Sequence, residues 1–313
     1  MKLIIQIPCY NEEKTLPITY EDLPKQINGI DVIETLIIDD GSSDRTTEIA
    51  KQIGINHIIS LNRNKGLANA FNLGIENCLR LGADIIVNTD GDNQYSGLDI
   101  PKLIEPIVNG EADVTIGDRQ IAKLKLFSFF KRFLQKIGSY VIKKLSRTDV
   151  VDTVSGFRAF SRDAAFRINI FTEFSYTVEN LIQLGNQKLK IISIPIETNK
   201  ILRESRLFKS IPSFVLQQIS TVIRVYSTYR PLRIFLLVGS IFIIPGILGL
   251  SRFLILFFYY QEQGGHIQSL IFSGVSINIG FIIVIFGVIA DLISNNRKLM
   301  EKVLYKIKTQ NEK

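Results

Sequence analysis

Two long apolar spans near the C-terminus constrain this chain more than any other feature of its sequence. They cover roughly 232–258 and 268–293, and each is long enough to cross a bilayer whose hydrocarbon core is about 30 Å thick. Charged residues nearly vanish across 231–295, whereas 1–230 has the mixed composition of a globular protein. We therefore expect a globular domain followed by two transmembrane helices, rather than a soluble protein that buries two apolar helices in its core.

The charges around these spans predict their orientation. The connector at 261–267 contains no Lys or Arg, whereas basic residues lie outside the pair on both sides, at Arg224, Arg230, Arg233, Arg297, Lys298, Lys302, Lys306 and Lys308. Because cytoplasmic loops carry the excess of Lys and Arg, we expect both outer ends in the cytoplasm, including a basic tail at 296–313. The chain opens directly into a strand-like run at 3–7, without a signal-peptide pattern, so we also expect a cytoplasmic N-terminal domain at the cell membrane.

Short β-branched runs alternate with helix-like stretches through the first 120 residues. The strand-like runs lie at 3–7, 35–38, 57–61, 84–88 and 113–117, and the helix-like stretches at roughly 12–27, 43–53, 66–81 and 99–109. This alternation predicts an α/β domain with a mostly parallel sheet. In such sheets ligands bind beyond the carboxyl ends of the strands. The sequence has neither a GxGxxG fingerprint nor a P-loop, so these two phosphate-binding motifs are excluded.

Basic residues gather in segments that suit a membrane surface. The net charge is +7, and Lys and Arg concentrate near 119–147, 200–233 and 297–313, which favours anionic head groups or phosphates over nucleic acid. Within 120–146, apolar residues recur at helical spacing among the basic ones, which is typical of a helix in a membrane interface. A helix packed on its own domain with a solvated basic face would show the same pattern. Residues 207–230 form a second candidate, a juxtamembrane amphipathic helix.

Three polar clusters end three successive strand-like runs. They are PCYNEE at 8–13, DDGSSD at 39–44 and DGDNQ at 90–94. Hard cations such as Mg²⁺ or Mn²⁺ are usually held by one or two carboxylates plus substrate phosphates, so we expect Asp90, Asp92 and Gln94 to bind one of these metals. The metal would neutralise charge on a departing diphosphate. The alternative is a purely structural acidic turn, which the presence of all three clusters in strand order makes less favoured.

The motifs in this order resemble those of family 2 glycosyltransferases with the GT-A fold. They are IPCYNEE (7–13), DDGSSD (39–44), DGDNQ (90–94), GDR (117–119) and SGFR (155–158). The resemblance covers about the first 210 residues and is strongest to the branch with dolichyl- and polyprenyl-phosphate sugar synthases. The YRPLRIF sequence and the two apolar spans that follow also look like membrane-anchored members of this branch. The resemblance implies a GT-A domain at 1–206, Rossmann-like with a mostly parallel sheet, ahead of the two-helix anchor.

The resemblance also implies roles for the residues of the donor side. Residues that would contact the nucleotide are Pro8, Tyr10, Glu12, Asp40, Asp90 and Arg206. Among them, Asp40 would reach the base and Asp90 would lie between the nucleotide and the metal. Asp92 and Gln94 would complete the metal site. The sequence leaves the base open between uracil and guanine, so the donor is a UDP- or GDP-sugar.

On the acceptor side the resemblance implies a set of phosphate-binding residues. They are Arg119, Ser155, Arg158, Arg203 and Ser205, to which the basic amphipathic segment adds Arg132 and Lys136. Asp90, Asp92 and Arg119 would be the catalytic residues. Relatives carry glycine and lysine where this sequence has Glu204 and Arg206, which puts the role of that loop in doubt, although arginine keeps the charge and can bind phosphate with two hydrogen bonds.

The function that follows is a metal-dependent, inverting transfer of a sugar to an undecaprenyl or dolichyl phosphate at the cytoplasmic membrane face. The product would be a lipid-linked sugar for cell-envelope glycan or protein glycosylation. A phosphate acceptor is already ionised near neutral pH, so catalysis needs positioning and electrostatics rather than a general base. We expect no nucleic-acid partner, and the two-helix anchor leaves room for a homo-oligomer.

Rival functions share the fold or the membrane anchor. One is transfer to a sugar already linked to a lipid diphosphate, and another is polysaccharide synthesis. Processive synthases of that fold carry a QxxRW segment, whereas this chain has no tryptophan. A catalytically inactive membrane scaffold is the non-enzymatic alternative, against which the intact Asp90, Asp92, Gln94 and Arg119 argue.

Overall fold

The chain forms two compact units in the computed structural model. The first comprises Met1–Val222 and Tyr305–Lys313, and the second Ile223–Leu304. The structure describes residues 1–120, 142–143, 146, 148–170, 176–199, 220, 227, 231–259 and 267–310. Most of the predicted segment 120–146, most of 207–230 and the connector between the apolar spans therefore lie outside the described residues.

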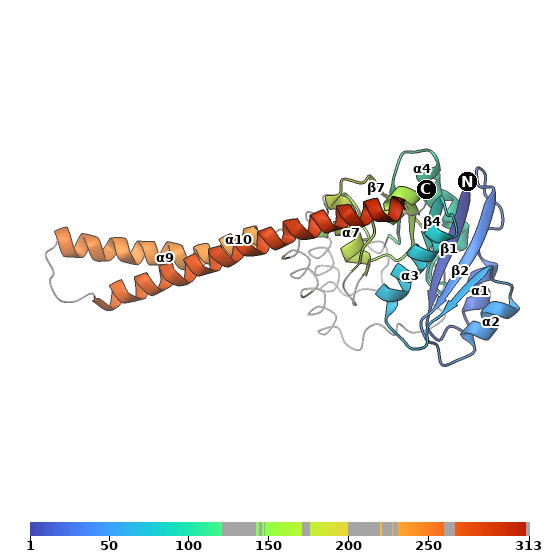
Figure 1. The fold of residues 1–313 in the computed structure, drawn as a ribbon, viewed down its shortest axis with the longest axis horizontal. Coiled ribbons are helices and arrows are strands. Elements are labelled where there is room, and N and C mark those ends of the chain that lie inside the picture. The colour runs from blue at the N-terminus through green and yellow to red at the C-terminus, as the bar shows by residue number, and fades with distance from the viewer. Residues whose placement is uncertain are drawn as a thin grey trace. The chain divides into compact units, whose positions relative to one another are not determined.

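A seven-stranded mixed sheet forms the centre of the first unit (Figure 1). Its strands are β1 (Lys2–Cys9), β2 (Val32–Asp39), β3 (His57–Ser60), β4 (Ile85–Asn88), β5 (Val114–Asp118), β6 (Arg158–Ser161) and β7 (Ile191–Pro195). Their order across the sheet is β3-β2-β1-β4-β6-β5-β7. All neighbours pair in parallel except β6, which runs antiparallel to both β4 and β5. The predicted α/β class is therefore confirmed, with one reversed strand inside the sheet.

Helices cover both faces of this sheet. They are α1 (Leu16–Glu21), α2 (Thr46–Gln52), α3 (Leu67–Arg80), α4 (Ile100–Val108), α6 (Arg162–Phe166) and α7 (Tyr176–Asn186), with a 3₁₀ turn, η1 (Gly97–Asp99), before α4. The helix expected over 12–27 is shorter than predicted. Pro17 suits its first turn, and the structure ends it at Glu21, three residues before Pro24, whose ring disfavours helical geometry in the residue before it.

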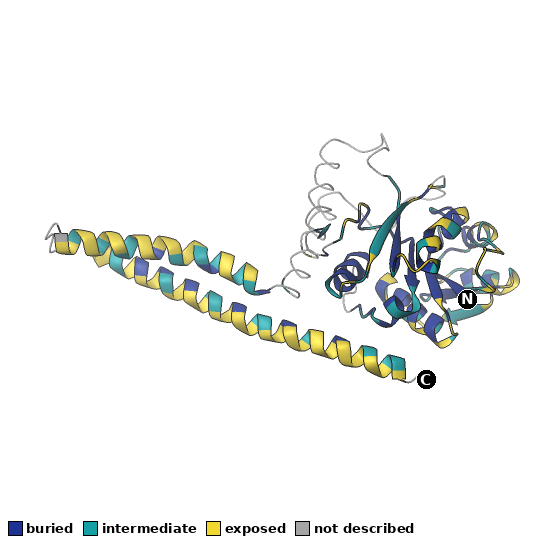
Figure 2. Ribbon diagram, turned by 90° about the horizontal axis from the view of Figure 1, so that it is seen from above, coloured by how far each residue is buried: buried dark blue, intermediate teal, exposed yellow. Residues whose placement is uncertain are grey.

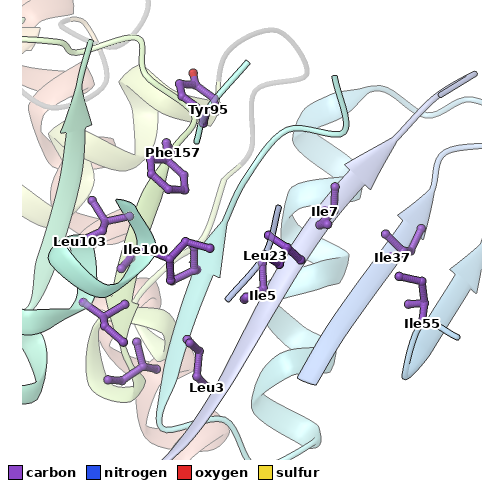
Figure 3. Packing of buried hydrophobic residues seen from close by; sticks show 14 of the residues in the cluster. Leu3, Ile5, Ile7, Leu23, Ile37, Ile55, Tyr95, Ile100, Leu103 and Phe157 are labelled. Atoms are coloured by element: carbon purple, nitrogen blue, oxygen red, sulfur yellow. The ribbon is translucent and has the colours of Figure 1, made fainter. Parts of the chain in front are cut away.

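The core lies on both sides of β1, which is buried along nearly its whole length. Leu3, Ile5 and Ile7 share one face with apolar residues of α4, among them Ile100 and Leu103 (Figure 3). On the opposite face, α3 approaches β1 at Gly74, where an added Cβ would lie only 2.3 Å from the Gln6 amide oxygen. A central strand covered by helices on both faces explains why its sequence reads as a continuous apolar run.

Because β6 is reversed, the loop before it reaches the edge of the sheet where β4 ends. The first residue of β6, Arg158, lies opposite Asn88, the last residue of β4. The loop before β6 therefore meets the loop after β4. In a fully parallel sheet, the segment preceding a strand would lie at the far edge instead.

The second unit contains α9 (Pro231–Tyr259) and most of α10 (Ile267–Gln310). The unit ends at Leu304, within α10. Both helices are long and apolar enough to cross a membrane, with mean hydropathy of 2.4 in each apolar window, and their residues are largely exposed (Figure 2). Small residues bring them close together: a Cβ added to Gly239 would lie 3.0 Å from the Gly280 carbonyl oxygen. Ser276 donates a hydrogen bond to the carbonyl of Phe242 at 2.9 Å. The two predicted apolar helices are thus confirmed, although α10 continues to Gln310, through most of the predicted tail at 296–313. Their insertion in a membrane stays a prediction.

Candidate active site

The three polar clusters predicted from the sequence meet at the carboxyl edge of the sheet. β1 lies between β2 and β4, so the loops that follow these strands are neighbours. Hydrogen bonds join the first loop to the second: Asn11 N–H donates to the Ser42 hydroxyl at 2.8 Å, and Glu12 N–H to the Thr46 hydroxyl at 2.8 Å. The third loop packs on the first at Gly91, where an added Cβ would lie 3.0 Å from Cys9 Sγ.

The donor-side residues differ in how far they are exposed. Tyr10 is exposed beside the edge of the sheet, whereas Pro8 is a buried residue of β1. Glu12 is also buried, and its carboxylate accepts a hydrogen bond from the Thr15 hydroxyl at 2.6 Å. This bond ties Glu12 to the turn that begins α1. Of the three, Tyr10 is the side chain with most surface available to a ligand.

Asp40 holds the loop before α3 in place, a structural role that was not predicted from the sequence. Its carboxylate is buried and accepts hydrogen bonds from the Lys65 and Gly66 amides, at 2.8 Å each. These bonds hold the loop that leads into α3, and the loop lines a pocket of about 350 Å³ formed by Ser60, Leu61, Asn62, Arg63 and Lys65. The predicted contact between Asp40 and a base remains a prediction. Lys65, whose amide binds the Asp40 carboxylate, is one of the residues that line the pocket.

The loop 90–94 carries the predicted metal ligands. Asp92 Oδ1 accepts a hydrogen bond from the Gln94 amide at 3.1 Å, and Asn93 between them adopts a left-handed backbone (φ 55°), which asparagine tolerates well. Among the described residues no group of three or more His, Cys, Asp or Glu could hold a metal by itself. Two carboxylates and an amide oxygen do fit a Mg²⁺ or Mn²⁺ ion that takes its remaining ligands from substrate phosphates and water. The buried Asn93 Oδ1, which has no hydrogen-bond partner, is one more oxygen in this loop.

Gly156 packs directly against the Asp90 carboxylate. A Cβ added there would lie 3.1 and 3.2 Å from the two Asp90 oxygens and 2.8 Å from Tyr176 Oη. The backbone of Gly156 is held on both sides, since its N–H donates to Tyr95 Oη at 3.0 Å and its carbonyl accepts from Asn88 Nδ2 at 2.8 Å. The absent side chain of this glycine thus leaves room for the carboxylate.

Two buried tyrosines complete the surroundings of Asp90. Burial raises the pKa of Tyr95 to about 12 and that of Tyr176 well above its ordinary value, and the charge of Asp90 adds to both shifts. Both hydroxyls therefore stay protonated across the physiological range. Tyr95 also stacks on Phe157 with ring centroids 5.2 Å apart (Figure 3). Sequence analysis missed both residues, although Tyr95 directly follows the DGDNQ motif.

Arg119 forms a bidentate ion pair with Asp152. Nε donates to Oδ2 at 2.7 Å and Nη2 to Oδ1 at 3.1 Å, and the two side chains are 15% and 3% exposed. Burial lowers the pKa of Arg119. The hydrogen bonds to Asp152 and the charges of Tyr95, Asp152 and Asp90 together outweigh this effect and raise the pKa above its usual value. Arg119 is therefore a permanent cation in the electrostatic surroundings of Asp90. Asp152 was not predicted as a site residue.

Arg158 and Ser155 lie deeper than predicted. The Arg158 guanidinium is fully buried and donates to the carbonyls of Ser155, Thr177 and Thr153 at 2.9, 2.8 and 3.1 Å. Burial lowers its pKa to about 10. Ser155 is also fully buried, and its hydroxyl has no partner. Arg158 thus holds the loop before β6, and contact with an acceptor phosphate would require these bonds to break.

Arg132, Lys136, Arg203, Ser205 and Arg206 lie outside the described residues and stay predictions. The chain that leads to the last three is anchored on the loop 90–94: Asn199 N–H donates to the Gln94 carbonyl at 3.0 Å. Thr198 also forms a β-bridge with Tyr95.

Comparisons with known proteins identify the family of this chain. Residues 4–167 match the family model described as glycosyl transferase family 2. A Methanococcus voltae protein named UDP-N-acetylglucosamine–dolichyl-phosphate N-acetylglucosaminyltransferase is 32% identical over 220 residues, covering 61% of this chain and 83% of that protein. The Pyrococcus furiosus dolichol-phosphate mannosyltransferase is 28% identical over 204 residues, covering 62% and 56%. The Micrococcus luteus undecaprenyl-phosphate mannosyltransferase is 25% identical over 219 residues, covering 66% and 88%.

A solved structure shares the architecture of the sheet and its helices. Glucosyl-3-phosphoglycerate synthase from Mycobacterium tuberculosis, in complex with Mn²⁺, UDP and phosphoglyceric acid, superposes with a TM-score of 0.55 at 18% identity, covering 72% of this chain and 78% of that one. At this identity the likeness establishes the fold alone, and it confirms the predicted GT-A architecture.

Proposed function

Because the chain belongs to glycosyl transferase family 2, we propose that it transfers a sugar from a nucleoside diphosphate to a polyprenyl phosphate. The names of three relatives, which specify dolichyl, dolichol or undecaprenyl phosphate, support this acceptor class. The observation that carries the proposal is that β4 and β5 both run antiparallel to the strand β6 between them. The residues that follow these two strands, Asp90 and Arg119, therefore lie at the same edge of the sheet. Such a site offers a carboxylate for a metal-bound donor and a cation for a phosphate.

The donor side is proposed to hold a UDP- or GDP-sugar. Tyr10 would lie against the nucleotide, and Asp40 together with the loop 60–65 would border its base. The support is the exposure of Tyr10 and the pocket beside Asp40. Asp92 and Gln94 would hold Mg²⁺ or Mn²⁺, and Asp90 would lie between that metal and the nucleotide. The metal, when bound, would neutralise charge on the leaving diphosphate. The Mn²⁺ and UDP in the structurally similar synthase support this part of the proposal.

The chemical step is a single displacement at the anomeric carbon. An acceptor phosphate oxygen forms the new bond to that carbon, while the bond to the diphosphate oxygen breaks on the opposite face and its electron pair leaves with the diphosphate. Configuration is therefore inverted. The acceptor monoester carries ionised oxygens near neutral pH, since its second pKa is about 6, so no side chain has to remove a proton. The protein contributes alignment of the two substrates and charge stabilisation by Arg119.

The apolar pair α9–α10 is proposed to anchor the enzyme in the cell membrane, with both ends and the sheet-containing unit on the cytoplasmic side. The support is the length and hydropathy of the two helices and the basic residues outside them. A polyprenyl phosphate keeps its tail in the bilayer, so a membrane-anchored enzyme meets its head group at the interface. The product is a lipid-linked sugar.

The test is transfer of label from radiolabelled nucleotide sugars to undecaprenyl or dolichyl phosphate by membranes that contain the protein. We expect an organic-extractable product that mild acid releases as free sugar, and no product in EDTA. Membranes with the Asp92→Asn variant serve as the control. Label that accumulates only in water-soluble glycan or long polymer would overturn the proposal in favour of a polysaccharide synthase.

A further inference from the structure

Asp152 lies under Arg119, in a loop that the structure fixes on both sides. Before it, the Val151 amide donates to the Ser193 hydroxyl of β7 at 3.3 Å. After it, the Thr153 carbonyl accepts a hydrogen bond from the buried Arg158 guanidinium at 3.1 Å. The backbone on both sides of Asp152 is therefore held by bonds that do not involve Arg119.

The Arg119 side chain depends on this carboxylate. Arginine has a long stem with many rotamers, and its planar fork is fixed when two of its N–H groups bind one carboxylate. Here the pair engages Nε and Nη2, while the chemistry of a guanidinium leaves Nη1 with two further donors. A buried ion pair is a poor means of stabilising a fold, because desolvation of both charges offsets their attraction. The pair is thus better explained by a need for a cation in a fixed orientation.

We propose that Asp152 is a positioning residue, which orients the Arg119 guanidinium at the edge where β4 and β5 end, before substrate binds. The inference rests on the proposed function, in which Arg119 contacts a phosphate. Arg158 also takes part in this arrangement. Because it holds the Thr153 carbonyl, it supports Asp152 and hence Arg119. The fully buried Arg158 thus supports the loop before β6, and Asp152 in that loop supports the partly exposed Arg119.

The experiment is a double-mutant cycle on kcat/KM for the acceptor, with the variants Asp152→Asn, Arg119→Lys and the double variant. We expect Asp152→Asn to raise the acceptor KM about tenfold and to leave calorimetric donor affinity within about twofold. In the Arg119→Lys background, which lacks the planar fork, the same change should have less than about a twofold effect. An equal loss in both backgrounds would overturn the proposal, because Asp152 would then act independently of Arg119.

Asp99 offers a matched control, since its side chain is 5% exposed and also pairs with a basic residue, Lys102, at 2.8 Å. Asp99→Asn should combine additively with Arg119→Lys. If Asp152→Asn does not fold, Asp152→Glu keeps the charge and should give a smaller rise in acceptor KM, and an unchanged KM in a folded variant would count against the proposal. The cycle uses whichever acceptor the wild-type enzyme accepts. A wrong acceptor assignment would therefore appear in the wild-type assay alone and leave the cycle readable.

Discussion

Replacing Gly156 with alanine tests how closely the loop before β6 is fitted to the carboxylate of Asp90, a proposed metal ligand. The new Cβ would lie 2.8 Å from Tyr176 Oη and 3.1–3.2 Å from both Asp90 oxygens. These distances are shorter than ordinary contacts, so either the tyrosine or the carboxylate has to move. Overpacking of a buried site typically costs about 1–3 kcal/mol. Disturbing a group that orients a metal ligand typically lowers metal affinity about 10–100-fold.

The assay measures two quantities on the purified full-length protein. Thermal unfolding should show Tm lowered by roughly 2–4 °C for each kcal/mol lost, as expected for a unit of this size. Calorimetry of nucleoside diphosphate binding at increasing Mn²⁺ should show half-saturation shifted to at least about tenfold higher metal. Adding Tyr176→Phe removes the oxygen at 2.8 Å, so the double variant should recover part of the lost stability but not the metal affinity. Gly156→Ala with wild-type metal dependence would refute the reasoning, whatever its Tm.

Three further predictions concern the rest of the site and the membrane unit. Asp92→Asn should fold normally but lose nearly all transfer at any Mg²⁺ or Mn²⁺ concentration, and full activity of this variant in EDTA would exclude the metal assignment. Asp40→Ala should lower the free energy of unfolding by about 1–3 kcal/mol, because it removes the buried carboxylate that accepts hydrogen bonds from the Lys65 and Gly66 amides. It should also weaken donor binding by calorimetry, and unchanged values in both would remove Asp40 from the site. A cysteine at Gly264 should react with an impermeant maleimide on intact cells and one at Asn311 should not, with low background because Cys9 and Cys78 are buried; the reverse pattern would invert the proposed topology.

The sequence predicted the parts of the fold that local pattern controls. Apolar runs located β1 to β5, and polar residues after three of them located the edge where the loops meet. Strands β6 and β7 were not predicted. β6 has only four residues and reads RAFS, so its strand character comes from pairing with β4 and β5 rather than from its own periodicity.

The same limit applies to the site. Asp90 and Arg119 stood out because they occur in recognisable motifs, whereas Asp152 is an ordinary acidic residue in sequence and gains importance only from a contact with Arg119, 33 positions away. Arg158 is the opposite case: it was predicted to bind phosphate, and the structure buries it fully. Its motif drew attention to its charge, but its depth in the sheet can only be known once Asn88 is seen opposite it.

The glycine contacts between α9 and α10 have a consequence for how this helix pair would assemble in a membrane. Lipid tails are as apolar as leucine, so in a bilayer two helices gain nothing by merely hiding their apolar surfaces from lipid. Gly239, Gly246 and Gly280 instead let the two backbones approach, with added Cβ atoms 2.8–3.0 Å from carbonyl oxygens of the facing helix. These contacts therefore hold α9 and α10 together without help from the sheet-containing unit. The helix pair is a candidate for a module that folds on its own. Transplanted onto an unrelated soluble enzyme, it should insert and pair without any part of the sugar-transferring unit.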